Sequence, residues 1–319
     1  MADGKTPPNR RSVAISIGSF DGAHRGHAAL IARARELAGP DGQVIAMSFY
    51  PHPMTVLRPE SAPARLTSFR QRSERLRKLG ADEVVPLEPG PDLLSMTAEQ
   101  FIEWLVERYH PTSFVEGPDF RFGKGRAGDN AMLRSLGETH GFTVEVVESV
   151  DVGLSDQSVV RASSTIARWL LDQGRVGDAA AVLGRPYEIC GTVRQGDQRG
   201  RLLGYPTANI ETECMLPRDG VYAGEVTIPG DRVMPAAVHI GPRSTFERMN
   251  RTIEVYAIGW DGPLAEGGEE YGWPISVRLT RWLRDQAKYD SAADLCVQMA
   301  RDVQRASDLF SVHAEGTVG

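Results

Sequence analysis

The stretch that decides the fold of the first half of the chain is Val13-Ala-Ile-Ser-Ile-Gly-Ser-Phe-Asp-Gly-Ala-His-Arg-Gly-His27. It opens with the apolar run Val13–Ile17, which is typical of a buried strand. A glycine-rich polar turn follows, and residues 28–37 then show the apolar period of a helix that ends at Gly39-Pro40. A buried strand that passes through a glycine turn into a helix indicates the first unit of a parallel α/β sheet.

The same alternation of strand and helix continues to about residue 150. We therefore expect a Rossmann-like α/β domain with an open parallel sheet and helices on both faces. Ligands of such sheets lie at the carboxyl ends of the strands. The further predicted strands are 44–49, 83–87, 113–115 and 143–150, and the further predicted helices are 68–79, 98–108 and 130–136.

The alternation of strands and helices ends after Gly184-Arg-Pro186. Beyond it, short strand-like runs are separated by Gly, Pro and Asp turns with no helix between them, a pattern typical of an antiparallel β-barrel or sandwich. One helix, over about residues 291–306, closes the chain. We place the domain boundary here and expect domains at residues 12–184 and 185–307. The predicted strands are 187–193, 220–228, 233–240, 253–260 and 275–279, and two helices, 163–171 and 176–183, precede them.

Composition bounds the class of protein. The length of 319 residues favours two domains, since a domain holds roughly 100–200 residues. The 36 basic residues are outnumbered by 42 acidic ones, which argues against a nucleic-acid partner. Three cysteines without a Cys-x-x-Cys pair argue against a disulfide framework and a zinc site. We find no signal-peptide pattern and no apolar run of about 18 residues, so we expect a cytoplasmic protein without a membrane partner.

The turn from Gly18 to His27 has the features of a phosphate site. Its glycines let the backbone approach a ligand closely, and the helix start that follows offers unpaired N–H groups with a positive dipole end. His24 and His27, three residues apart, can both donate hydrogen bonds to charge that develops on a phosphate chain. The structural alternative, two surface histidines in a polar loop, explains less of this pattern.

Two other stretches of the first half carry polar or aromatic groups. Ser163-Ser-Thr165 with Arg168 is either a set of helix N-caps or a phosphate clamp. Asp119-Phe-Arg-Phe-Gly123 is either a hydrophobic plug or part of a binding loop. Gly123–Gly128 matches Gly-x-Gly-x-x-Gly, but it lies outside the first strand–helix unit, so we do not interpret it as a dinucleotide site. The chain has no Gly-x4-Gly-Lys-Ser/Thr motif and is therefore not a P-loop kinase.

In the second half, a second nucleotide site is suggested by glycine turns that precede Tyr205-Pro-Thr-Ala-Asn209. Glycine turns bring backbone N–H groups to a nucleotide, and the Thr207 hydroxyl and Asn209 carbonyl offer oxygen ligands to magnesium. The alternative is a set of plain turns between barrel strands. Glu254 alternates with the apolar Ile253 and Val255, and on this pattern alone it is a solvated strand carboxylate.

The first half resembles the adenylyltransferase module of prokaryotic bifunctional riboflavin kinase/FAD synthetases. That family's Gly-x-Phe-Asp-Gly-x-His-x-Gly-His, Asp-Phe-Arg-Phe-Gly and Ser-Ser-Thr-x-x-Arg motifs match residues 18–27, 119–123 and 163–168. The resemblance implies that both histidines and Arg168 act on ATP phosphates, and that the aromatic loop helps hold the flavin. Ile166 and Ala167 replace the common Arg and Ile of the family.

The second half resembles the riboflavin kinase module of the same family. Its Gly-Arg-x-x-Gly-Phe/Tyr-Pro-Thr-Ala-Asn motif is matched at residues 200–209, its Gly-Val-Tyr strand at 220–222 and its catalytic glutamate at Glu254. Arg284 and Tyr289 match positions before the last helix. Departures are His239 for the common Asn, Ser244-Thr-Phe246 for Pro-Thr-Phe, and an acidic extension over residues 261–270.

The resemblance implies a flavin-cofactor synthase that phosphorylates riboflavin with ATP and then adenylylates FMN to FAD with release of pyrophosphate, using Mg²⁺. The alternatives are a chain that keeps only one activity and a non-catalytic flavin- or nucleotide-binding regulator. Catalysis is assigned to Glu254, His24, His27 and Arg168, and the metal to Thr207 and Asn209. The expected ATP-binding residues are Gly18, Phe20, Asp21, Gly22, His24, His27, Ser163, Ser164, Thr165, Arg168, Gly191, Gly196, Gly200, Arg201 and Gly204. The expected flavin-binding residues are Asp119, Phe120, Arg121, Phe122, Tyr222 and Arg284.

Overall fold

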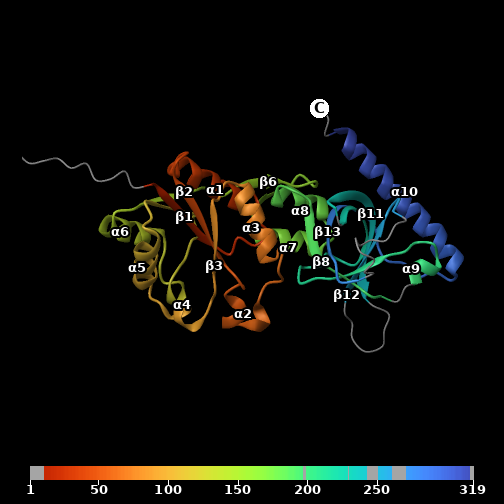
Figure 1. Ribbon diagram of the computed structural model, residues 1–319, viewed down its shortest axis with the longest axis horizontal. Coiled ribbons are helices and arrows are strands. Elements are labelled where there is room, and N and C mark those ends of the chain that lie inside the picture. The colour runs from red at the N-terminus through yellow and green to blue at the C-terminus, as the bar shows by residue number, and fades with distance from the viewer. Residues whose placement is uncertain (1–10, 197–198, 229, 243–250, 261–270, 317–319) are drawn as a thin grey trace, which may run out of the picture. The chain divides into compact units, whose positions relative to one another are not determined.

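The computed structural model describes residues 11–196, 199–228, 230–242, 251–260 and 271–316 (Figure 1). The chain forms two compact units. The first comprises Met1–Pro63 and Phe69–Asp151, and the second comprises Ala64–Ser68 and Val152–Gly319. The two helices expected at 163–171 and 176–183 therefore lie in the second unit. The expected boundary between residues 184 and 185 stays a prediction about independent folding.

The first unit is a parallel sheet in the order β3-β2-β1-β4-β5. Strand β1 lies at its centre and pairs in parallel with β2 on one side and β4 on the other. The predicted α/β fold is confirmed. The strands are β1 (Val13–Gly18), β2 (Gln43–Phe49), β3 (Glu83–Leu87), β4 (Ser113–Glu116) and β5 (Thr143–Val146). The helices are α1 (Arg25–Ala38), α2 (Met54–Leu57), α3 (Phe69–Lys78), α4 (Pro91–Ser95), α5 (Ala98–Tyr109) and α6 (Asn130–His140), with 3-10 turns η1 (Pro59–Ser61) and η2 (Lys124–Arg126).

Each face of this sheet has its own core because successive strand side chains point to opposite sides. Ala14 and Val44 pack in the core that contains residues of α1 and α3. Ile15 and Ile45 pack in the core that contains residues of α5 and α6. Both faces are thus covered by helices, which leaves the carboxyl edge of the strands as the place for ligands.

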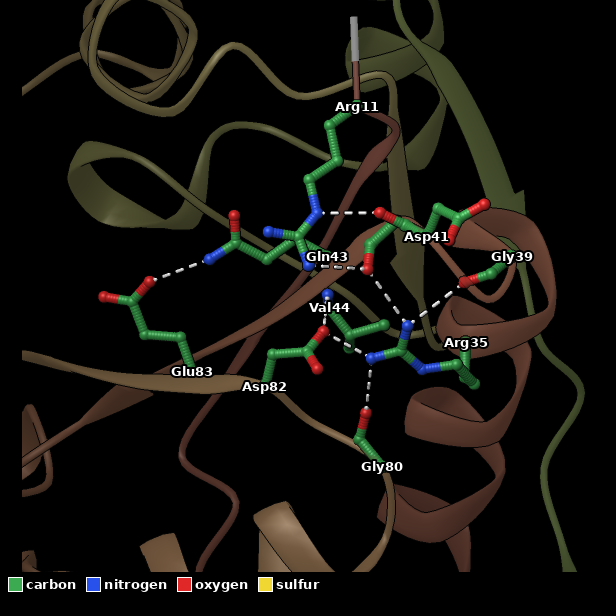
Figure 2. Close-up of polar contacts among 10 residues, drawn as sticks. Arg11, Arg35, Gly39, Asp41, Gln43, Val44, Gly80, Asp82 and Glu83 are labelled. Carbon is green, nitrogen blue, oxygen red and sulfur yellow. Dashed lines mark hydrogen bonds and ion pairs between the residues drawn. The ribbon is translucent and has the colours of Figure 1, made fainter.

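The amino edge of the sheet is tied by Arg35, from the last turn of α1 (Figure 2). Its guanidinium donates to the carbonyls of Gly39 and Gly80 at 3.2 and 3.1 Å and forms an ion pair with Asp82. Asp82 also accepts from Val44 N at 2.7 Å. Although burial by itself raises the pKa of Asp82, the bonds from Val44 N and Arg35 outweigh it and hold this pKa below the ordinary value.

The second unit is built on a closed antiparallel barrel in the order β10-β11-β12-β9-β8-β13. The predicted barrel with a terminal helix is confirmed. Leu283 of β13 and Ala306 of the terminal helix belong to one apolar cluster. The strands are β8 (Tyr187–Arg194), β9 (Ala208–Glu211), β10 (Gly220–Ile228), β11 (Arg232–Pro242), β12 (Arg251–Ala257) and β13 (Pro274–Arg284). The helices are α7 (Ser164–Asp172), α8 (Val176–Leu183), α9 (Arg199–Leu202) and α10 (Ala292–Gly316), and β6 (Asp151–Gly153) and β7 (Val159–Arg161) form a separate two-stranded sheet.

One strand and one helix of the barrel were not predicted. Residues 208–211 form strand β9, which pairs with β12 and β8 and closes the barrel, whereas the alternative interpretation made Pro206-Thr-Ala-Asn209 a turn. A short helix, α9, also stands between β8 and β9, where no helix was expected.

Candidate active sites

The turn from Gly18 to His27, called the histidine turn below, lies at the carboxyl end of the central strand β1. Its backbone is unusual, since Phe20, Gly22 and Ala23 have φ values of 50°, 81° and 40°, which belong to the left-handed region. His24 then caps α1, with its Nδ1 accepting from His27 N at 3.4 Å. The two imidazoles are stacked with their centroids 3.6 Å apart. This turn brings the predicted pair of histidines together at a helix N-terminus, where an anion is favoured.

Two residues of this turn that were predicted to bind ATP are buried. Phe20 is fully buried, and its ring centroid is 5.0 Å from that of His27. Asp21 is only 4% exposed and forms an ion pair with Arg72 of α3 at 3.0 Å. Sequence analysis did not single out Arg72, because α3 contains several arginines and nothing in its pattern distinguishes the buried one.

A buried carboxyl at the end of β4 was also missed. In the register of β1 and β4, Ala14 pairs with Ser113 and Ile15 pairs with Phe114. Past these two pairs, the side chain of Glu116 bonds to β1, and its Oε1 accepts from Ile17 N at 2.8 Å. Burial raises the pKa of Glu116 well above its ordinary value, and the bond from Ile17 N opposes this only in part. The strand order reverses between β1 and β4, which is where open α/β sheets bind their ligands.

The aromatic loop after β4, residues 119–123, has buried as well as exposed side chains. Phe122 is buried, pairs with Gly128 and stacks on Phe120 with centroids 5.4 Å apart. Arg121 is exposed and donates to the carbonyl of Phe120. Within the Gly123–Gly128 stretch, residues Lys124–Arg126 form the 3-10 turn η2. Asp119 lies in the same loop.

The Ser-Ser-Thr-x-x-Arg motif begins α7 in the second unit. Ser163 is the N-cap and accepts from Ile166 N at 3.2 Å, so the capping interpretation holds for this residue. Ser164 and Thr165 lie in the first turn. Arg168 donates through Nε to the carbonyl of Ala64 at 2.6 Å. Its partnership with His24 and His27 at one phosphate chain stays a prediction.

The outer face of the barrel gathers the predicted oxygen ligands. Ile253 and Val255 are buried in the interior, so Glu254 points outward, as the alternation predicted. Glu254 faces Asn209 of β9 in the strand register, and Thr207 Oγ1 lies 3.5 Å from its Oε2. The Thr207 hydroxyl just before β9, the Asn209 amide of β9 and the Glu254 carboxylate of β12 thus lie close together.

Glycines pack against these groups. A Cβ at Gly196 would lie 2.0 Å from Asn209 Nδ2, and one at Gly200 would lie 3.2 Å from Thr207 Oγ1. The chain after β8 therefore approaches the outward side chains as closely as only glycine allows. Arg201 lies exposed in α9, Gly204 follows with φ 82°, and Gly191 lies within β8.

Hard oxygen ligands of this kind suit Mg²⁺, which is held by one or two protein groups and completed by phosphates and water. Within the described residues there is no group of three or more His, Cys, Asp or Glu side chains that could hold a metal by itself. The donors around Glu254 thus fit a magnesium ion that arrives with a nucleotide.

Comparison with known proteins agrees with the two predicted domains and their activities. The sequence profile of FAD synthetase matches residues 6–162, and that of riboflavin kinase matches residues 183–310. The bifunctional riboflavin kinase/FMN adenylyltransferase of Escherichia coli strain K12 is 34% identical over 93% of both chains. The enzyme of the same name from Haemophilus influenzae is 31% identical over 94% of this chain and 95% of its own. The chain belongs to the bifunctional riboflavin kinase/FMN adenylyltransferase family.

A solved structure is also similar over most of the chain. It is titled a macrolide-efflux protein from Streptococcus pneumoniae, has a TM-score of 0.82 and is 26% identical over 93% of this chain and 94% of its own. In the part of the chain that the structure describes, no helix is long and apolar enough to cross a membrane.

Membership of this family makes the chain an enzyme of FMN and FAD biosynthesis, with a riboflavin kinase domain and an FMN adenylyltransferase domain that use ATP. The predicted family, fold and function are therefore confirmed. The assignment of individual site residues stays a prediction.

Two residues expected to bind flavin in this family are engaged by protein groups. Tyr222 is fully buried and donates its hydroxyl to the carbonyl of Arg218, and burial raises its pKa. Arg284 makes a forked contact with the carboxylate of Asp302 on α10, with bonds of 2.7 and 2.9 Å. Tyr222 thus ties β10 to the chain just before it, and Arg284 ties β13 to α10.

His239, the departure from the common Asn, lies opposite Glu254 in the register of β11 and β12. Its Nε2 is 3.0 Å from Gln286 Nε2, which also donates to the carbonyl of Ile240. Burial lowers the pKa of His239, with Arg284 adding to the effect, while Glu254 acts in the opposite direction. The departures at Ser244–Phe246 and over residues 261–270 lie outside the described residues.

Proposed function

We propose that the outer face of the barrel around Glu254 performs the phosphorylation of riboflavin. The observation that supports this most is that Glu254 of β12 faces Asn209 of β9 and lies close to Thr207, which precedes β9. Thr207 and Asn209 would hold Mg²⁺, which neutralises charge on the ATP phosphates. Glu254 accepts the proton of the terminal ribityl hydroxyl as that oxygen attacks the γ-phosphorus, ADP leaves, and FMN is formed.

The histidine turn would perform the second reaction. A phosphate oxygen of FMN attacks the α-phosphorus of ATP, the bond to the β-phosphate bridging oxygen breaks, and pyrophosphate leaves. Because His24 Nδ1 accepts from His27 N, the neutral ring of His24 carries its proton on Nε2 and can donate it in a hydrogen bond to the phosphate chain. His27 and the N-terminus of α1 add further donors and positive charge. The predicted action of Arg168 on the ATP phosphates belongs to the same proposal.

The remaining details belong to the same proposal. The aromatic loop at Phe120 is proposed to hold the flavin in the first unit, and the enzyme is proposed to work in the cytoplasm. Since both reactions start from small molecules and ATP, no nucleic acid or membrane takes part.

The roles can be separated by crossed substitutions in the full chain. Glu254→Gln keeps the shape and hydrogen-bonding capacity of the side chain but removes the base, so riboflavin phosphorylation should fall roughly 10²–10⁴-fold. FAD formation from supplied FMN should stay unchanged in this variant. His24→Ala should do the reverse, with a loss on the order of 10²–10³ in FAD formation.

The measurement is chromatography of FMN and FAD after incubation with riboflavin or FMN, ATP and Mg²⁺. A folded Glu254→Gln enzyme that phosphorylates riboflavin at the unmodified rate would remove Glu254 from the mechanism. A wild-type chain that binds flavin yet forms neither FMN nor FAD would favour the alternative of a non-catalytic flavin- or nucleotide-binding regulator.

A further inference from the structure

Arg72 of α3 connects the carboxyl ends of two strands beneath the histidine turn. Its Nη1 lies 2.7 Å from the carbonyl oxygen of Ser19, 3.1 Å from Ser48 Oγ and 3.0 Å from the carbonyl oxygen of Phe49. Its Nη2 donates to Asp21 Oδ1 at 3.0 Å. Ser19 and Asp21 follow β1, while Ser48 and Phe49 end β2. One side chain from a helix thus fixes both strand ends.

The pair of Arg72 and Asp21 is buried, with 4% and 5% of the two side chains exposed. Taking two charges out of water costs more than their attraction returns in many proteins, so a buried pair is weak evidence for stability. We therefore expect a role of this buried pair other than stability. The backbone conformation next to it indicates such a role.

The backbone between these contacts is strained. Phe20 and Ala23 have side chains and nevertheless adopt φ values of 50° and 40°. The left-handed conformation is unfavourable for an L-residue, and it persists only where the surroundings determine it. Arg72 holds Ser19 and Asp21, the residues on either side of Phe20. Its contacts therefore fix the turn from which α1 and the imidazoles of His24 and His27 begin.

We propose that Arg72 is a positioning residue for adenylyl transfer, which together with Asp21 holds the left-handed turn that sets His24 and His27 at the start of α1. This inference rests on the proposed role of the two histidines. It gives Asp21, expected from its motif to bind ATP, the role of partner to Arg72. Lysine is not equivalent to Arg72, since a single ammonium nitrogen cannot hold the strand-end oxygens as Nη1 does and also hold Asp21 as Nη2 does.

The test uses the full chain with Arg72→Lys, and with Arg70→Lys as the matched control. Arg70 lies on the same helix with 72% of its side chain exposed, 3.9 Å from Glu74. FAD formation from FMN and ATP, riboflavin phosphorylation and the imidazole NMR signals of His24 and His27 are measured on each preparation.

For Arg72→Lys we expect kcat of FAD formation to fall at least about 10²-fold, the loss typical of a catalytic group displaced by about 1 Å. Riboflavin phosphorylation should stay within about twofold, since no residue of that site is altered. The His27 signals, which the rings of His24 and Phe20 shift by their proximity, should move. Arg70→Lys should leave all three measurements unchanged.

Asp21→Asn supplies a second route if Arg72→Lys does not fold. It should lower kcat of FAD formation in the same direction, and where both single variants fold, the double variant should be no slower than the slower single one. Wild-type FAD formation in folded Arg72→Lys or Asp21→Asn, or additive losses in the double variant, would overturn the proposal. A wild-type chain that forms no FAD would contradict the proposed function instead, and the imidazole signals would still report whether Arg72 positions the histidines.

Discussion

Gly196→Ala is a direct test of the proposed magnesium site. The added Cβ would lie 2.0 Å from Nδ2 and 2.4 Å from Cγ of Asn209, whereas ordinary contact begins at 3.4 Å. The side chain of Asn209 must therefore move by more than about 1 Å or leave its position. Displacement of this size from a reactive arrangement costs roughly 10² in rate. Because the clash is with the end of a side chain, the barrel itself should keep its stability.

Gly191→Ala provides the contrast. Its added Cβ would lie 2.3 Å from the carbonyl oxygen of Glu211, a backbone atom in the ladder between β8 and β9. Backbone cannot rotate out of the way, so this change should destabilise the protein by about 1–3 kcal/mol. Any loss of riboflavin phosphorylation in this variant should follow its loss of folded protein.

The assay is riboflavin phosphorylation over a series of Mg²⁺ concentrations, beside thermal unfolding of the same samples. Gly196→Ala should need more Mg²⁺, have kcat lowered about 10²-fold and keep its Tm, with FAD formation from FMN unaffected. If Gly196→Ala phosphorylates riboflavin at the unmodified rate and with the same Mg²⁺ dependence, Asn209 does not hold the metal.

Two further predictions concern buried or paired carboxyls. Glu116 has its pKa raised above 4.5 in the native state by burial, so the native state keeps a proton that the unfolded chain has lost, and stability falls as pH rises from about 4.5 toward the native pKa. Glu116→Gln cannot lose a proton, so its urea midpoint should fall less than that of the wild type between pH 4 and 8, and equal slopes would refute the burial argument. Asp82 has its pKa lowered below 3.8, so its contribution is present above that pH and is lost as pH falls through the native pKa. Arg35→Ala should therefore lower Tm at pH 7 by the equivalent of about 1 kcal/mol or less, since the pair is partly exposed. Below pH 3 the decrease in Tm should be smaller. An equal decrease at both pH values would assign the effect to the carbonyl bonds of Arg35 alone.

Much of the fold could be predicted because its elements differ in period. The helix at 176–183 and the strand at 220–228 were predicted with the bounds the structure gives them, since each has an unbroken pattern between clear turn residues. The first helix begins at Arg25 rather than at residue 28 because His24 provides a cap that an apolar period does not reveal.

Features that depend on distant partners could not be predicted. Strand β9 is short and follows a proline, and only its pairing with β12 and β8 makes it a strand. The burial of Arg72 and Glu116 is likewise a property of the assembled sheet, because their partners Asp21 and Ile17 lie far from them in the sequence. A local pattern contains none of these partners.

The two sites also show why a motif identifies a function more readily than it assigns roles. Within the histidine turn, Asp21 is buried on Arg72, whereas His24 caps the helix that begins there. On the barrel, Arg284 is bound to Asp302, whereas Glu254 points outward toward Asn209. A motif retains the residues that shape a site together with those that touch the substrate, since losing either kind ends the activity. Burial and partners separate the two kinds, so substitutions at Asp21 or Arg284 should change stability as well as rate, while those at Glu254 should change rate alone.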